Sequence, residues 1–198
     1  MAAALNDLHA IPVRPLARAD AIVLARRLLL GIGIDTDADD PVAAAMARAT
    51  DGIPFYAHKL ADGLDLRRRA GLAVDTAAVW STREAAVART GGDPWELDYH
   101  PKQVARDYGP GPDGVLALAV LDALAAAPSG ALGFDRLLDR VRLDEGVAAT
   151  GAVHRDRLLN LVQSLRRDDD IDIDAGSVSF SSDVLRDAWR VTRLLEHP

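Results

Sequence analysis

The sequence contains no cysteine among its 198 residues. Disulfide bonds, thiolate metal sites and cysteine nucleophiles are therefore excluded. Aromatic residues make up only 5% of the chain, whereas apolar residues, many of them alanine, reach 49%. This balance favours helices that pack closely through small side chains. It also supplies enough apolar surface for a sizeable core, which excludes a wholly disordered chain.

Long apolar runs and lysine are scarce as well. No apolar run approaches the length of a membrane span, and residues 1–10 lack the basic start and apolar centre of a secretion signal. We therefore expect a cytoplasmic protein with no membrane partner. Only two lysines occur, and the net charge is −7, which disfavours a general polyanion binder.

Apolar periodicity and turn residues predict a mainly α-helical fold. One helix ends near Gly31, a second begins at Pro41 with Asp40 as its cap, and a third begins at Pro54. Two more are expected at 76–89 and 101–108. The Gly-Pro-Gly-Pro sequence at 109–112 is the strongest turn signal, so we place a domain boundary between residues 1–109 and 113–198.

The second predicted domain has three helices, then two segments that alternate with period two at 171–174 and 177–180. Ala175 and Gly176 lie between them and can form the tight turn of a hairpin. Ser182 can cap a last helix, whose Trp189 we expect to pack against the central helix at Leu116 and Val120. This order predicts a helical bundle followed by a winged-helix domain with a small β-hairpin wing.

Short motifs across nearly the whole chain resemble the C-terminal region of bacterial and archaeal AAA+ and STAND-type ATPases. They are Pro-Leu at 15–16, Thr-Asp-Gly-Ile-Pro-Phe-Tyr at 50–56, Arg-Asp-Tyr-Gly at 106–109, Leu-Asp-Ala-Leu-Ala at 121–125, Ser-Leu-Arg-Arg-Asp at 164–168, and Phe180 before Leu-Arg-Asp-Ala-Trp at 185–189. In that family a helical lid follows the nucleotide-binding core, and a winged helix follows the lid. The resemblance implies a lid-like domain at 1–109 and a winged helix at 113–198.

Gly52 and Pro54 match the Gly-x-Pro motif of the lid. In the family this proline packs beside the adenine base, so the resemblance implies that Gly52 and Pro54 contact ATP or ADP when an ATPase core is present. The residues themselves favour a simpler role, in which Gly52 ends one helix and Pro54 begins the next.

The catalytic elements of the family are absent from the sequence. A P-loop requires Gly-x-x-x-x-Gly-Lys-Ser/Thr, whereas Lys59 and Lys102, the two lysines, follow no glycine. No apolar strand ending in paired acids precedes the lid, so the magnesium-binding Walker B element is absent too. We expect either a fragment of a longer ATPase or a freestanding lid and winged helix, with no catalytic residue and no cofactor of its own.

The third helix of the winged-helix domain carries a possible DNA-reading face. Arg157, Asn160, Ser164 and Arg167 fall on one stripe, and these residue types can contact base edges. Against this role, residues 113–198 hold ten arginines and no lysine against fifteen acids. The wing offers Asp172 and Asp174 where a phosphate-gripping wing offers cations, and residues 143–153 are too long for a helix-turn-helix turn.

No metal site or catalytic constellation emerges from the sequence. The five histidines lack the spacing of metal ligands. The aspartates at 168–170 lack the alternation of a calcium loop, so we expect these aspartates to be solvated. The leading hypothesis is a non-catalytic module that binds a protein partner or the missing ATPase core. The alternative is a winged-helix DNA-binding transcriptional regulator, and a third reading is an enzyme whose site leaves no recognisable motif.

Overall fold

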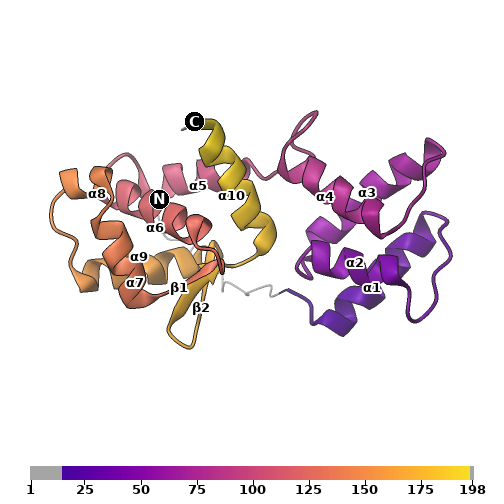
Figure 1. Ribbon diagram of the computed structural model, residues 1–198, viewed down its shortest axis with the longest axis horizontal. Coiled ribbons are helices and arrows are strands. Elements are labelled where there is room, and N and C mark those ends of the chain that lie inside the picture. The colour runs from indigo at the N-terminus through magenta and orange to yellow at the C-terminus, as the bar shows by residue number, and fades with distance from the viewer. Residues whose placement is uncertain (1–14, 197–198) are drawn as a thin grey trace, which may run out of the picture. The chain divides into compact units, whose positions relative to one another are not determined.

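A computed structural model describes residues 15–196, with side chains as far as Arg193 (Figure 1). The described chain is mainly helical and carries one small three-stranded antiparallel sheet in its C-terminal part, which confirms the predicted fold class. The chain divides into two compact units, residues 1–79 and 80–198.

The first unit consists of helices that pack through small apolar side chains. They are α1 (Arg18–Gly31), α2 (Pro41–Ala49), α3 (Pro54–Arg69) and the first residues of α4 (Thr76–Val87). Helix α1 packs against α2 and α3. Ala25, Leu29, Met46, Leu60 and Leu64 are completely buried, so they form the centre of this core.

The beginning of α2 follows the sequence prediction. Pro41 is its first residue, and Asp40 Oδ1 accepts hydrogen bonds from the N–H groups of Val42 and Ala43 at 2.7 and 3.1 Å. Proline suits this position because the first helical N–H has no partner within the helix, and the aspartate satisfies two of the next donors.

The second unit is built around a central helix, α6 (Pro112–Ala126). Its neighbours are α5 (Tyr99–Tyr108), α7 (Phe134–Arg142), α8 (Glu145–Ala149), α9 (Arg155–Arg167) and α10 (Asp183–Glu196). Residues on almost every side of α6 are buried, as its nearly uninterrupted apolar sequence predicts. The short helix α8 lies within the 143–153 segment, which is too long for a helix-turn-helix turn.

The wing forms where the sequence predicts it. Strands β2 (Ile171–Asp174) and β3 (Ser177–Phe180) pair antiparallel, with Asp174 opposite Ser177. The two turn residues, Ala175 and Gly176, have φ values of 47° and 81°, as the favoured two-residue hairpin turn requires. A third strand, β1 (Ala131–Gly133), pairs with the other edge of β3 and was not predicted.

Helix α10 reaches the central helix through Trp189. The side chain is 4% exposed, and its Nε1–H donates to Asp122 Oδ1 of α6 at 2.8 Å. Arg193 Nη2 meets the other oxygen of Asp122 at 2.6 Å. The predicted packing of Trp189 on this helix is confirmed through Asp122, whereas its contact with Leu116 and Val120 stays a prediction.

The division between the units lies 30 residues before the Gly-Pro-Gly-Pro stretch at which we expected a boundary. Helix α5 packs against α6, and its Tyr108 OH donates to Asp168 Oδ2 at 2.7 Å. Arg83 Nη2 likewise pairs with Asp187 Oδ2 at 2.7 Å. The turn at 109–112 therefore separates two helices inside the second unit, because a turn signal ends a helix without determining what that helix packs against.

Candidate functional site

Gly52 occupies a position that only glycine fits well. Its φ is 70°, its C=O accepts a hydrogen bond from the Leu16 N–H at 2.9 Å, and a Cβ there would lie 2.6 Å from the Leu16 carbonyl oxygen. Pro54 is the first residue of α3. These contacts account for both residues as helix boundaries, and the adenine contact implied by the resemblance stays a prediction.

The four DNA-reading candidates all lie on α9, but three of their side chains make hydrogen bonds within the chain. Nε and Nη2 of Arg157 both donate to Asp113 Oδ1, at 3.0 and 2.7 Å. Ser164 Oγ accepts from Arg167 Nη2 at 2.8 Å. Asn160 and Arg167 are exposed, so the predicted stripe exists without offering a free Arg157.

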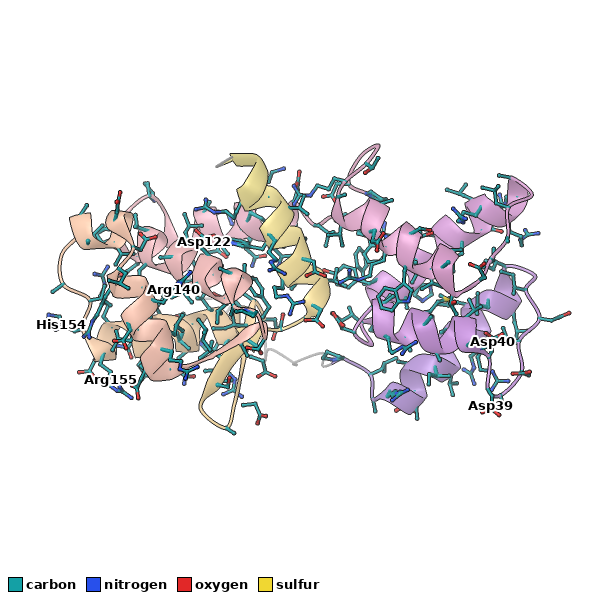
Figure 2. All side chains as sticks on the ribbon, viewed as in Figure 1. Asp39, Asp40, Asp122, Arg140, His154 and Arg155 are labelled. Atoms are coloured by element: carbon teal, nitrogen blue, oxygen red, sulfur yellow. The ribbon has the colours of Figure 1, made fainter. Side chains whose placement is uncertain are left out.

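Two further arginines of α9 meet carboxylates from other elements of the same unit. Arg155, at the beginning of the helix (Figure 2), pairs with Asp135 of α7 and lies over the Phe134 ring at 4.9 Å from its centroid. Arg166 Nε lies 3.9 Å from Asp172 Oδ1 of β2. Acids from α6, α7 and the wing thus surround α9 and offset its positive charge.

A second cluster of titratable groups lies where α9 leads into the wing. Tyr108 binds Asp168 from α5, and His100 Nδ1 of the same helix lies 3.5 Å from Asp170 Oδ1. The Asp170 backbone donates to Leu165 O and accepts from Ser181 N–H, both at 3.1 Å. Asp170 is only 6% exposed, so the prediction that these aspartates are solvated is wrong for this residue.

Burial dominates the electrostatics of this cluster. It raises the pKa of Asp170, and the His100 imidazole partly offsets this effect. The pKa of Tyr108 is also raised, first by burial and then by the Asp168 carboxylate that its hydroxyl binds. At 3.5 Å, His100 Nδ1 makes no full hydrogen bond and is a buried atom without a partner. One hydrogen bond, from Tyr108 to Asp168, therefore joins helix α5 to the residues just before β2, and His100 lies close to Asp170 without a full hydrogen bond.

The His100–Asp170 pair opens onto a small cavity. The other residues that line it are apolar and come from the loop before α5, α5 itself, α6, β3 and α10: Leu97, Pro101, Leu121, Phe180, Leu185, Ala188 and Trp189. Within residues 15–196, no three His, Asp or Glu side chains gather in a way that could hold a metal ion. His9 and His197 lie outside the described residues.

An open groove runs along α6 and α7. One hollow is lined by Ala123, Ala126, Ala127, Pro128, Leu132, Arg136, Asp139, Arg140 and Leu143, and the adjoining one by Ala119, Asp122, Ala123, Ala126, Arg140, Leu143 and Asp144. Figure 2 shows Asp122 and Arg140 on the two helices that form it. We call this surface the α6–α7 groove. Sequence analysis did not identify it, because the apolar stripe of α7 (Leu137, Leu138 and Val141) marks only the buried face of this helix.

No protein-family model matches the chain, and no curated protein matches it either. The likeness to the lid and winged helix of AAA+ and STAND-type ATPases therefore stays a prediction from the motifs.

Of the helices within the described residues, none has both the length and the apolar character needed to cross a bilayer.

Proposed function

We propose that the chain is a non-catalytic, cytoplasmic interaction module that binds protein, arranged like the lid and winged helix of an AAA+ or STAND-type ATPase. The observation that supports protein binding over DNA binding is the pairing of Arg155, Arg157 and Arg166 on α9 with Asp135, Asp113 and Asp172. In a DNA-binding winged helix this helix presents cations and hydrogen-bond donors to the duplex.

The ion pairs weaken DNA binding in two ways. Arg157 can reach a phosphate only by leaving Asp113, so the contact replaces an existing charge-assisted hydrogen bond. The carboxylates that remain beside α9 repel the phosphate backbone, in a unit that is already acidic. A protein partner faces neither penalty, because it can present uncharged or cationic groups to the same surface.

ATP or ADP enters this proposal only through a longer parent protein. Gly52 and Pro54 could lie against adenine there, whereas the phosphates need the Gly-Lys-Ser/Thr loop that this sequence lacks. We therefore expect no ATP turnover and no tight nucleotide binding by the chain itself. A P-loop encoded upstream of Met1 in the same reading frame would identify the chain as part of an ATPase.

The proposal is tested by binding and turnover measurements on the full chain. We expect fluorescence anisotropy to give a Kd for random duplex DNA weaker than about 10⁻⁴ M near physiological salt, and calorimetry to detect no tight ATP binding. Steady ATP hydrolysis or tight ATP binding would contradict the non-catalytic assignment.

DNA recognition is the second candidate, because Asn160 and Arg167 are exposed on one face of α9. It predicts a Kd that weakens steeply between about 50 and about 200 mM salt and weakens further in Arg157→Ala. Under the protein-binding proposal, Asp113→Asn frees Arg157 and raises the weak DNA affinity instead. The two variants therefore distinguish an arginine that reads DNA from one that is held by Asp113.

A further inference from the structure

The α6–α7 groove carries a protruding leucine beside an alanine-lined hollow. Leu143, just after the end of α7, is 81% exposed, and it is the most exposed large apolar side chain in the described part of the chain. The floor beside it consists of Ala119, Ala123 and Ala126, spaced four and three residues apart so that they share one face of α6. Small side chains let another backbone approach closely, so the surface offers both a projection and a space that receives one.

The charges on the groove side of α7 also lack ion-pair partners among the described residues. Arg136, Asp139, Arg140 and Leu143 follow at helical spacing and form one stripe along the groove. Other arginines of this unit, such as Arg157 and Arg193, pair with aspartates. For Arg136, Asp139 and Arg140 the described residues provide no ion-pair partner.

This stripe is complementary to itself when two copies run antiparallel. The centre of residues 136–143 falls between Asp139 and Arg140, so a two-fold axis there places each Asp139 opposite the partner's Arg140. The same operation brings Leu143 opposite Arg136, beside Pro128 and Leu132 in the hollow of the other copy. A contact in which one patch meets itself is the isologous type found in two-fold dimers.

We propose that two copies of this chain associate through their α6–α7 grooves, with Leu143 of each seated in the hollow of the other and Asp139 paired with the partner's Arg140. The contact rests on one large apolar side chain and one reciprocal ion pair per copy. It therefore belongs to the weak class of interfaces. This self-association goes beyond the proposed function and holds whichever protein the module binds.

Sedimentation velocity of the full chain, from about 1 to about 200 μM, tests the contact. We expect the wild type to shift from monomer to dimer over this range and Leu143→Asp to remain monomeric throughout. Leu159→Asp is the matched control, because Leu159 is also exposed, at 44%, but lies on α9 away from the groove. A monomeric wild type at 200 μM would mean that another protein, or nothing, covers the groove, and it would overturn the proposal.

Charge exchange tests the symmetry of the contact. Arg140→Asp places two carboxylates opposite each other in a homodimer, and Asp139→Arg places two guanidinium groups opposite each other. Each variant alone should raise the dimer Kd at least tenfold, whereas a one-to-one mixture should form a heterodimer with near wild-type Kd, because both pairs are again of opposite sign. If the mixture stays as weakly associated as the separate variants, the antiparallel pairing is wrong.

Discussion

In the first unit, helices meet through alanine and leucine side chains and through close approach of the backbone, whereas in the second unit polar side chains link elements distant in sequence. The ion pairs of Asp65 with Arg68 and Arg69 connect neighbouring turns of α3. In the second unit, Arg83–Asp187 and Trp189–Asp122 join residues 104 and 67 positions apart.

This difference indicates that the two units respond to different perturbations. Apolar packing depends little on pH or salt, whereas ion pairs and buried titratable groups respond to both. Substitutions that add volume to a backbone contact should therefore affect the first unit most. Loss of a linking side chain, or a change in pH, should affect the second.

The largest effect is expected from Trp189→Ala. The variant removes a buried ring from the contact between α10 and α6 and leaves Asp122 without its indole donor, so unfolding should require roughly 3–5 kcal/mol less free energy. Urea denaturation followed by circular dichroism measures this loss. Trp80→Ala is the control, because Trp80 is 37% exposed. A loss below about 1 kcal/mol in Trp189→Ala, the range of surface substitutions, would mean that the ring is not buried.

Gly52→Ala should have the next largest effect. The backbone at Gly52 is left-handed, with a φ of 70°, and an alanine held in this conformation loses about 1–2 kcal/mol. Its Cβ would also lie 2.6 Å from the Leu16 carbonyl oxygen. We expect a total loss of about 2–3 kcal/mol in urea denaturation. Gly71→Ala separates the two causes, because Gly71 has a similar φ of 73° with no atom near its added Cβ. Equal losses in both variants would show that the approach of Leu16 contributes nothing.

The smallest effect concerns the pH dependence of the second unit. Because burial raises the pKa of Asp170 in the folded protein, the folded state binds this proton more tightly than the unfolded chain does. The stabilisation from Asp170 is thus present below the unfolded pKa of aspartate, near about 3.9, and is lost as the pH rises through the folded pKa.

Asp170→Asn removes this titration. The stability of the variant relative to wild type should therefore increase as the pH rises from about 4 to about 7. Urea denaturation at a series of pH values measures the difference, and Asp169→Asn, at the neighbouring exposed position, controls for the substitution itself. A constant difference between Asp170→Asn and wild type would show that Asp170 is ionised equally easily in both states.

Local signals in the sequence predict local structure well. The wing hairpin appears at the predicted residues because alternation in both strands and the Ala175-Gly176 turn specify the same register. The caps at Asp40 and Ser182 also follow the prediction: Ser182 Oγ accepts from the Leu185 N–H at 3.1 Å. Strand β1 was missed because three residues, Ala131–Gly133, are too few to show a period, and it forms only because β3 offers a free edge.

Tertiary placement was harder to predict from the same residues. A run of three aspartates resembles a solvated segment, whereas Asp170 is buried beside a cavity that residues of α5, α6, β3 and α10 line. The four residues of the candidate stripe do share helix α9, as their spacing predicts. The neutralisation of Arg157, however, depends on Asp113, 44 residues earlier. Leu143 follows the end of α7 on the side of its charged residues, and it is 81% exposed.

The contacts of α10 also bear on the order in which the protein forms during synthesis. Asp187, Trp189 and Arg193 join α10 to Arg83 and Asp122, so the second unit closes only when its last helix has been translated. Contacts between distant residues form slowly because a long loop must close first. The first unit needs no such wait, since Leu16 and Gly52 meet within the first 52 residues. During translation we therefore expect a folded first unit to precede an incomplete second unit, in which the face of α6 that packs against α10 stays exposed until α10 forms.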